Sequence, residues 1–562
     1  MKRQSLLARL MGGLAAASLL LAACAPAATP TAAPQPTDVP AAAFEPMKVE
    51  ASSCDYGGEF KAIEAVDAQT VKFTLCYPDP AFLSKVAFTD FAIQDQAYLD
   101  ANGGDSLKMS EQPNGTGPYI VKEWKRGESI TFEANPNYWG GAPKIKTLIF
   151  RWQKEAAQRL LELQAGTADG IDNPAPEDFA TIQGDSNLQL IPRPALNIFY
   201  IGFNNTIAPF DNEKVRQAIA MGIDRQRIVD NYYPAGSSVA AQFVPESFSP
   251  GFVSEGEGAA WYDYDVDAAK ALLAEAGYPD GFEVDLYFRN VVRGYLPLPD
   301  KVAQEIQAQL AELGITVTIN EKESTTFLDE ASAGDKYGLY LLGWGADYPD
   351  ATNFYDYHFA NTSNKQFGAL FDDVVAAIRA GAQTGDIAAR QAAYVEVAAL
   401  IKQHVPMIPV AHGGSGVAYS AAVQNGHTSP LGNELFSVMD NGKEQFVWIQ
   451  NGEPGALWCA DETDGESLRA CNQYSEALLA YKVGGVEAVP ALAESWTFSA
   501  DLQEWTFTLR SGVTFHNGAT LDANDVVASF KAQWDATDPN HKGRTTTFEY
   551  FTGFFGAFLN AP

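Results

Sequence analysis

A strand–helix–strand alternation in the middle of the chain limits its fold most strongly. Over 282–288 apolar and polar residues alternate, as on a strand with one buried face. Apolar residues then recur at helical spacing over 302–313, Gly314 marks the end of that helix, and strand-like alternation resumes over 315–319. A further apolar strand is predicted over 337–344. This βαβ order predicts an α/β lobe, in which ligands bind near the carboxyl ends of the strands.

The first 23 residues have the features of an export signal. A basic start is followed by an apolar stretch over 11–21 that is too short to span a bilayer. Small residues then lead to Cys24, as in a bacterial lipoprotein signal, and this resemblance implies cleavage before Cys24 and lipidation of its thiol. The alternative is a plain secretory signal with a chance cysteine. We expect residues 24–43, built almost wholly of Ala, Pro and Thr, to be a flexible linker.

Length and charge narrow the function of the remaining chain, 44–562. It is long enough for two or three domains, and no later segment has the apolar run of a membrane helix. The formal net charge of the full chain, −32, would repel nucleic acid and anionic lipid. Because no Cys/His cluster has metal-ligand spacing, we expect no metal and no cofactor. We also expect the protein to be a monomer.

The cysteine count agrees with export. Five cysteines less the lipidated one leave an even number for an oxidising compartment, and three pairings are possible. Local pairing, Cys54–Cys76 and Cys459–Cys471, is the simplest; buried free thiols are the alternative.

No set of residues indicates catalysis. The chain lacks an HExxH motif, a phosphate loop and a GxSxG elbow. The His-Gly-Gly-Ser-Gly run at 412–416 faintly resembles an esterase oxyanion loop, but we interpret it as a glycine-rich chain crossing. We therefore expect a protein that is not an enzyme.

Five sequence blocks are spread over nearly the whole body. They are 115–119 (GTGPY), 135–141 (NPNYWGG), 215–219 (VRQAI), 343–350 (GWGADYPD) and 493–530. Each is weak alone, but together they resemble the extracytoplasmic solute-binding proteins of peptide ABC importers, family 5. The resemblance implies a two-lobed α/β clamshell of the periplasmic-binding-protein type, with an extra subdomain in lobe I.

The order of the blocks departs from the family. The block 493–530 comes last here, whereas the family places it near the mature N-terminus. Residues 429–438 resemble the family's C-terminal end, and 445–449 resemble its first strand. We therefore interpret the chain as circularly permuted, with the old termini joined near 440–445. A fusion of two truncated copies is the alternative.

The permutation predicts the domain boundaries. Lobe I should comprise 44–203 and 412–562, and lobe II 204–411, with two crossings, near 203–205 and near 411–413. Two crossings suit a hinge. The segment 446–449 should be a strand inside lobe I, and 44–50 should emerge beside 554–562.

Within the family, residues 293–297 are similar to the Arg-x-Tyr-x-Pro motif of dipeptide-binding proteins. This likeness implies that Arg293 holds the ligand's C-terminal carboxylate and that Asp347 holds its N-terminal ammonium. Gly294, where those proteins have proline, is a departure that leaves the ligand's length and side chains open.

The chemistry of the ligand agrees with this assignment. A zwitterionic peptide in a closed cleft needs a partner for each end, because an unpaired buried charge is costly. Arg offers a planar fork for carboxylate, and Asp accepts from ammonium. Tyr295 and Trp344 are candidate pocket walls, and the loop 464–467 should face the cleft from lobe I. The alternatives are a core role for Trp344, a surface salt bridge for Arg293 and a turn role for Asp347.

We therefore expect an extracytoplasmic (periplasmic) lipoprotein, anchored to the cell membrane by lipid, that captures dipeptides or short peptides by lobe closure. Its partners would be the peptide, a membrane permease and the ATPase of that importer. An oligosaccharide-binding lipoprotein of the same family is the alternative, and a secreted hydrolase is a third possibility.

Overall fold

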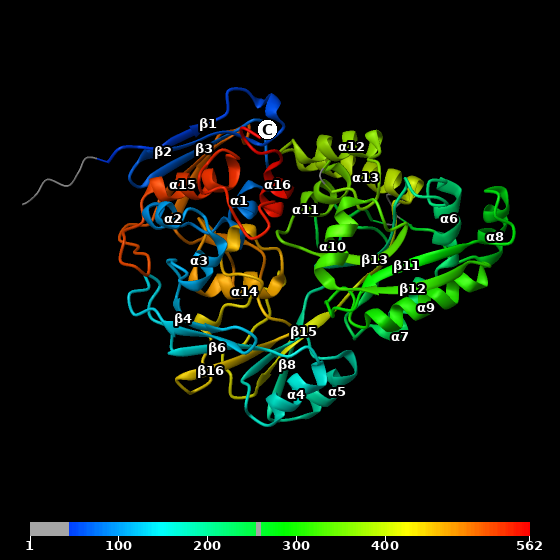
Figure 1. Cartoon of the computed structure of the whole chain (residues 1–562), viewed down its shortest axis with the longest axis horizontal. Coiled ribbons are helices and arrows are strands. Elements are labelled where there is room, and N and C mark those ends of the chain that lie inside the picture. The colour runs from blue at the N-terminus through cyan, green and yellow to red at the C-terminus, as the bar shows by residue number, and fades with distance from the viewer. Residues whose placement is uncertain (1–43, 255–259, 363, 562) are drawn as a thin grey trace, which may run out of the picture. The chain divides into compact units, whose positions relative to one another are not determined.

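The computed structural model describes residues 44–254, 260–362 and 364–561. The signal, Cys24 and the 24–43 linker lie outside the described residues. Glu45–Pro562 forms one compact unit, and it contains two lobes built on three large sheets (Figure 1). Within the described ranges, no helix has the length and apolar character needed to cross a membrane.

Lobe I contains a seven-stranded sheet with a strand from the C-terminal part of the chain at its middle. That strand, β16 (Gln445–Gln450), is parallel to both neighbours, β6 and β7. The predicted strand at 446–449 is thus confirmed inside lobe I, and the last part of the chain is not a detached unit. The sheet order is β4 (Tyr119–Lys125), β5 (Ser129–Ala134), β6 (Thr147–Trp152), β16, β7 (Gly170–Asp172), β15 (Ser415–Ser420), β8 (Leu188–Arg193).

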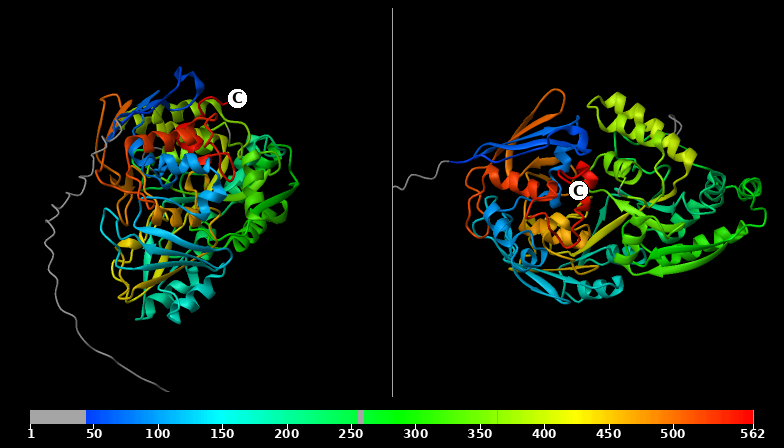
Figure 2. Two further views of the ribbon diagram at one scale, coloured as in Figure 1. Left: turned by 60° about the vertical axis from the view of Figure 1, so that its left-hand side comes forward. Right: turned by 45° about the horizontal axis from the view of Figure 1, so that its top comes forward.

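A five-stranded sheet in lobe I joins both ends of the unit. Its order is β1 (Lys48–Glu50), β2 (Phe60–Asp67), β3 (Thr70–Leu75), β20 (Glu504–Leu509), β19 (Ala493–Phe498). The Met47 backbone N–H donates to Asn524 Oδ1 (2.8 Å), and the Glu59 N–H donates to the Phe555 carbonyl (2.7 Å). The early and late segments are therefore neighbours in space, as the blue and red ribbons show (Figure 2). We expected residues 44–50 to lie beside 554–562. The hydrogen bond to Phe555 comes instead from Glu59, which follows that segment.

Lobe II is built on a six-stranded mixed sheet. Its order is β10 (Ser238–Val239), β14 (Met407–His412), β9 (Asn197–Phe203), β13 (Leu339–Gly345), β11 (Glu283–Arg289), β12 (Thr316–Lys322). β11 is parallel to β12 and β13, and α9 (Pro299–Glu312) connects β11 to β12. The predicted βαβ unit is confirmed.

The first predicted lobe boundary is wrong. β9 lies in the lobe II sheet between β13 and β14, so the chain crosses over 194–196 and not near 203–205. All of β9 is buried, because an apolar strand at the centre of a sheet is covered on both faces. The second crossing is as predicted: His412 ends β14, and Ser415 begins β15.

Glycine is required at the second crossing. A Cβ on Gly413 would lie 2.1 Å from the carbonyl oxygen of Gly294. The run at 412–416 is therefore a close passage of backbone beside the segment that carries Arg293.

Helices cover the sheets of both lobes (Figure 1). In lobe I they are α1 (Phe82–Lys85), α2 (Gln96–Asn102), α3 (Ser106–Glu111), α4 (Ala156–Gln164), α5 (Phe179–Gly184), α14 (Gly465–Tyr474), α15 (Ala523–Trp534) and α16 (Glu549–Phe555). In lobe II they are α6 (Glu213–Gly222), α7 (Arg225–Tyr232), α8 (Val266–Glu275), α9, α10 (Ser324–Ala333), α11 (Thr352–Tyr355), α12 (Asp372–Ala382) and α13 (Ile387–His404).

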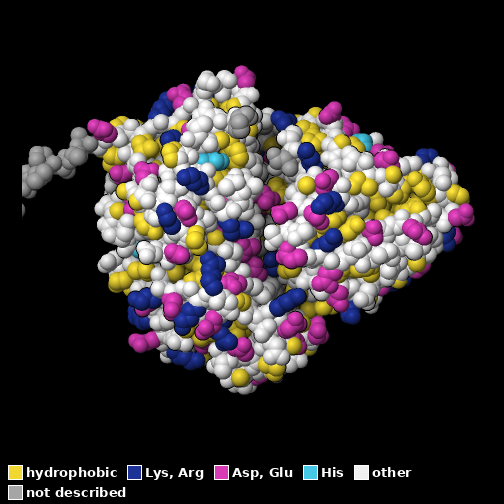
Figure 3. Space-filling model, viewed as in Figure 1, with side chains coloured by type: hydrophobic (Ala, Val, Ile, Leu, Met, Phe, Trp, Pro, Cys, Tyr) yellow, Lys and Arg dark blue, Asp and Glu magenta, His cyan; other side chains and the backbone are white. Residues whose placement is uncertain are grey.

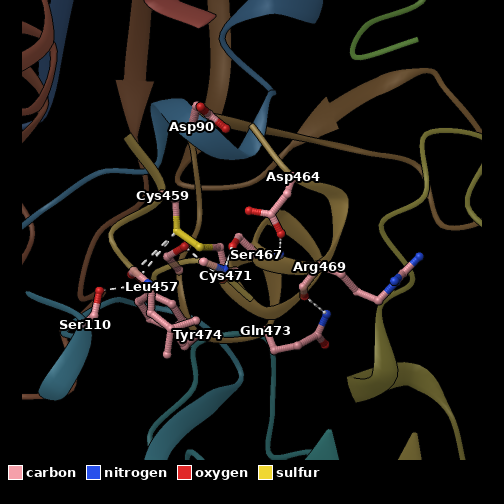
Figure 4. The surroundings of a disulfide bond; sticks show 12 residues. Asp90, Ser110, Leu457, Cys459, Asp464, Ser467, Arg469, Cys471, Gln473 and Tyr474 are labelled. Carbon is pink, nitrogen blue, oxygen red and sulfur yellow. Dashed lines mark hydrogen bonds between the residues drawn. A yellow bond between two sulfur atoms is a disulfide. The ribbon is translucent and has the colours of Figure 1, made fainter. Parts of the chain in front are cut away.

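Both local cysteine pairs are disulfides in the structure. Cys54 is bonded to Cys76, and Cys459 is bonded to Cys471. The second bond ties the segment before α14 to that helix (Figure 4).

Candidate functional site

Asp347 lies just beyond the carboxyl end of β13, where lobe II touches lobe I. Its side chain is buried, with 7% exposed. Oδ2 accepts from Asn353 Nδ2 (2.9 Å) on α11 of the same lobe. Oδ1 accepts from the Tyr550 hydroxyl (3.0 Å) on α16 of lobe I, and the Asp347 backbone carbonyl accepts from the Tyr481 hydroxyl (3.1 Å). The carboxylate is therefore held in place from both lobes.

No cation neutralises Asp347 within the described part of the chain. Burial raises the pKa of its carboxyl to about 7, although hydrogen bonds from Asn353 and Tyr550 act in the opposite direction. A buried carboxylate with hydrogen bonds but no cation is suited to accept an ammonium group from a ligand.

Arg293 also lies between the lobes. Its guanidinium contacts Glu466 at the start of α14, with Nη1 3.2 Å from Oε1 and Nη2 3.4 Å from Oε2. The Glu466 side chain is 8% exposed and that of Arg293 24%. This ion pair joins lobe II to lobe I, so it is not an ordinary surface salt bridge. The predicted loop 464–467 is the N-cap and first turn of α14, and through Glu466 it faces the other lobe as expected.

Tyr295 supports the segment that carries Arg293. It is buried, and a Cβ on Gly343 of β13 would lie 2.3 Å from Tyr295 Cδ2. The Tyr233 hydroxyl donates to the Tyr295 carbonyl (2.7 Å), and Arg289 donates to the Tyr295 hydroxyl (3.1 Å). Tyr295 therefore fixes the loop against β13.

Trp344 lies beside Asp347 and is half-buried. Its ring stacks on Tyr357 with centroids 4.4 Å apart. Its Nε1 donates to Asn353 Oδ1 (3.1 Å), the same oxygen that accepts from the Asp347 backbone N–H (3.0 Å). Asn353 thus links the two predicted site residues.

Several groups at this contact were not predicted from the sequence. They are Asn353 and Tyr357 of lobe II, and Asp90, Tyr481, Glu549 and Tyr550 of lobe I. Glu466 lies in the predicted segment 464–467, but its pairing with Arg293 was not predicted. Tyr550 is 203 positions from Asp347, so no local spacing could indicate that the two residues meet. Within the described ranges, no three or more His, Cys, Asp or Glu side chains are grouped to hold a metal ion.

The profile of the bacterial extracellular solute-binding proteins, family 5 (Middle), matches residues 31–366 and 487–550. The chain belongs to this family, whose members are transport binding proteins rather than enzymes.

Individual relatives support the same class. The heme-binding protein A of Haemophilus influenzae is 31% identical over 68% of this chain and 70% of its own length. A dipeptide-binding protein of Pseudomonas aeruginosa is 31% identical over 67% and 71%. Among solved structures, the dipeptide-binding protein of a Pseudoalteromonas species in complex with Met-Leu has a TM-score of 0.58 at 27% identity, over 63% of this chain and 70% of that one.

Proposed function

We propose that this chain is the substrate-binding lipoprotein of an ABC importer, and that it captures dipeptides or short peptides between its lobes. The observation that carries this proposal is Asp347, a buried carboxylate at the lobe contact with no cation beside it in the described structure. Several relatives are named for dipeptide binding, which favours a peptide as the ligand.

The two charged residues would divide the recognition of a zwitterion. Asp347 would accept from the N-terminal ammonium, which would neutralise the buried carboxylate. Arg293 would release Glu466 and bind the C-terminal carboxylate in a bidentate pair. The ligand would then bridge the lobes where the Arg293–Glu466 pair bridges them now, and closure would follow from ligand contacts to both lobes.

Delivery requires a partner in the membrane. We propose that lipid on Cys24 anchors the chain, that the 24–43 linker gives it reach, and that the closed lobes present the ligand to a permease and its ATPase. The intact mass of the native protein tests the anchor, because an unlipidated N-terminus would contradict it.

We also propose that the chain is circularly permuted. Two observations support this interpretation over a fusion of truncated copies. β16 lies at the middle of the lobe I sheet between two parallel neighbours, and β20 pairs with β3 to complete the five-stranded sheet. In the described structure, β16 and β20 thus each complete a sheet of lobe I and do not duplicate a strand from the earlier part of the chain, as a circular permutation requires.

The sugar alternative is weaker because an aromatic platform needs a free ring face. The Trp344 ring is stacked on Tyr357, and the rings of His358 and Tyr550 lie next to it, with centroids 4.9 and 6.5 Å away.

A thermal-shift screen followed by calorimetry tests the function. Di- and tripeptides should raise the melting temperature and remain unhydrolysed, and cello-oligosaccharides should not. Stabilisation by the oligosaccharides alone would contradict peptide binding.

A further inference from the structure

Asp90 is a buried acid without a partner at the same lobe contact. It lies in a single helical turn, Thr89–Phe91, in lobe I and is 2% exposed. Neither carboxylate oxygen has a hydrogen-bond partner among the described residues. Leaving a buried acid unsatisfied is unfavourable, so such a group points to a partner that binds there.

Four other acids act on Asp90. Burial raises the pKa of its carboxyl well above the usual range, and the charges of Asp347, Glu462, Asp461 and Asp464 raise it further. Asp347 belongs to lobe II and the other three to lobe I. The turn that carries Asp90 packs against α14, whose N-cap is Asp464, and both side chains are drawn around the disulfide in Figure 4. Acidic side chains lie along the groove between the lobes (Figure 3).

Two of these acids are already satisfied by the protein. Asp461 accepts from the Thr545 and Phe548 backbone N–H groups, at 2.6 and 3.0 Å. Glu462 is paired with Arg544, whose Nε is 2.9 Å from Oε1. These two carboxylates are therefore not open for a ligand.

The remaining acids, Asp90, Asp347 and Asp464, have no ion pair within the described ranges. Asp464 accepts from the Ser467 backbone N–H (2.8 Å) as the N-cap of α14. Arg293 acts to lower the pKa of Asp464, although burial and Glu466 raise it overall. The neighbour before Asp464, Thr463, accepts at its carbonyl from the Tyr550 hydroxyl (3.4 Å) that also donates to Asp347, and Glu466, two residues after Asp464, is the partner of Arg293. The acids thus extend from the proposed carboxylate partner toward the proposed ammonium partner.

A ligand with one ammonium group can neutralise Asp347 only. When the lobes close on a neutral dipeptide, Asp90 would then stay buried and unpaired, and the half-buried Asp464 would keep only its hydrogen bond from Ser467. A cationic side chain would neutralise them, and its N–H groups would satisfy the oxygens of Asp90. A metal ion is a poorer fit, because the described acids are not grouped for coordination.

We propose that Asp90 and Asp464 form a subsite for a cationic side chain, so that the preferred ligands are basic peptides containing Lys or Arg. This inference rests on the proposed function and adds the class of side chain. In this proposal, lobe I selects the ligand's side chain through Asp90 and Asp464, while Asp347 and Arg293 of lobe II bind the two ends of the peptide.

Calorimetry with matched dipeptides tests the subsite. The probes are Lys-Ala against norleucine-Ala and Ala-Lys against Ala-norleucine, since norleucine keeps the aliphatic chain without the charge. Ala-Ala is the reference ligand. At one of the two positions, the lysine peptide should bind at least about tenfold more tightly than its norleucine match.

Variants then assign this preference to Asp90. Asp90→Asn should reduce the preference to less than about threefold, while Ala-Ala binds as in the wild type. Asp464→Asn keeps an N-cap side chain for α14 and should reduce the preference in the same direction. The matched control is Asp267→Asn, an exposed residue of α8 in lobe II, which should leave the preference unchanged.

Two results would overturn the inference. Equal binding of the lysine and norleucine peptides at both positions would do so, and so would a preference that survives unchanged in folded Asp90→Asn. Failure of Ala-Ala to bind the wild type would instead contradict the proposed function, so the two failures are distinguishable.

Discussion

Two groups of buried charges in this chain are built in opposite ways. Near the first crossing in lobe I, Arg193 and Arg469 each contact both Asp172 and Glu434, at 2.7–2.9 Å. At the lobe contact, Asp347 has hydrogen bonds but no cation. The first group is neutral within itself, whereas the second needs a charge from outside.

The pKa shifts of the two groups reflect this difference. Burial acts to raise the pKa of Glu434, but the Arg193 and Arg469 guanidiniums hold it well below the usual range. Burial raises the pKa of Asp347 to about 7, with no cation to oppose it. Paired buried charges therefore indicate structure, and unpaired ones at a lobe contact indicate binding.

The largest expected effect comes from breaking the paired group. Glu434→Gln leaves two buried guanidiniums with one carboxylate, and it should lower the free energy of unfolding by about 3–5 kcal/mol. Urea denaturation measures this loss, and folded protein should still bind peptide. Glu50→Gln breaks an exposed pair and serves as the control that should not change stability. A Glu434 variant as stable as the wild type would remove the contrast between the two groups.

Changing the binding group should affect affinity instead. Asp347→Ala and Arg293→Ala should each weaken peptide binding by about 2–5 kcal/mol, because each leaves a ligand charge buried and unpaired. Folding should survive in both variants, as thermal melting would show. Unchanged affinity in either variant, measured by calorimetry, would remove that residue from the site.

A smaller effect is expected at the second crossing. Gly413→Ala would force the Gly294 carbonyl to move, because the new Cβ would lie 2.1 Å from it. We expect a loss of stability of about 1–3 kcal/mol, together with weaker peptide binding, since the displaced segment carries Arg293. Gly184→Ala is the control, because its Cβ would meet no atom within 4 Å. If both variants melt alike, the close passage does not constrain the crossing.

The pH dependence gives the most specific signal. The folded protein holds the Asp347 proton more tightly than the unfolded chain, whose aspartate pKa is about 4. The ligand-free protein should therefore lose stability from this residue as pH rises from about 4 to about 7, and no more above that. Asp347→Asn has no carboxyl at this position and therefore cannot lose this contribution to stability. The wild type should thus melt progressively lower relative to Asp347→Asn across this range, and a constant difference would refute the assignment.

The local elements of the fold were predictable from the sequence because each is encoded by nearby residues. The alternation over 282–288 and the helical spacing that follows correspond to β11 and α9. The first lobe boundary was not predictable in this way. Whether β9 joins one lobe or the other depends on pairing with β13 and β14, which lie far away in the sequence.

The residues of the candidate site also fall into those that a local motif predicts and those that only long-range contacts reveal. Asp347 and Arg293 were proposed from short motifs. Glu466 as the partner of Arg293, and the acid Asp90, became visible only when distant segments were brought together. Contacts across a domain interface have no local sequence pattern.

The most direct test of the account compares Ala-Phe with N-acetyl-Ala-Phe by calorimetry, in the wild type and in Asp347→Asn. Acetylation removes the ammonium charge that Asp347 is proposed to bind. In the wild type, acetylation should weaken binding by at least about a hundredfold, and in Asp347→Asn the two peptides should differ by less than about tenfold. An equal loss on acetylation in both proteins would show that the ammonium is bound elsewhere and would contradict the account.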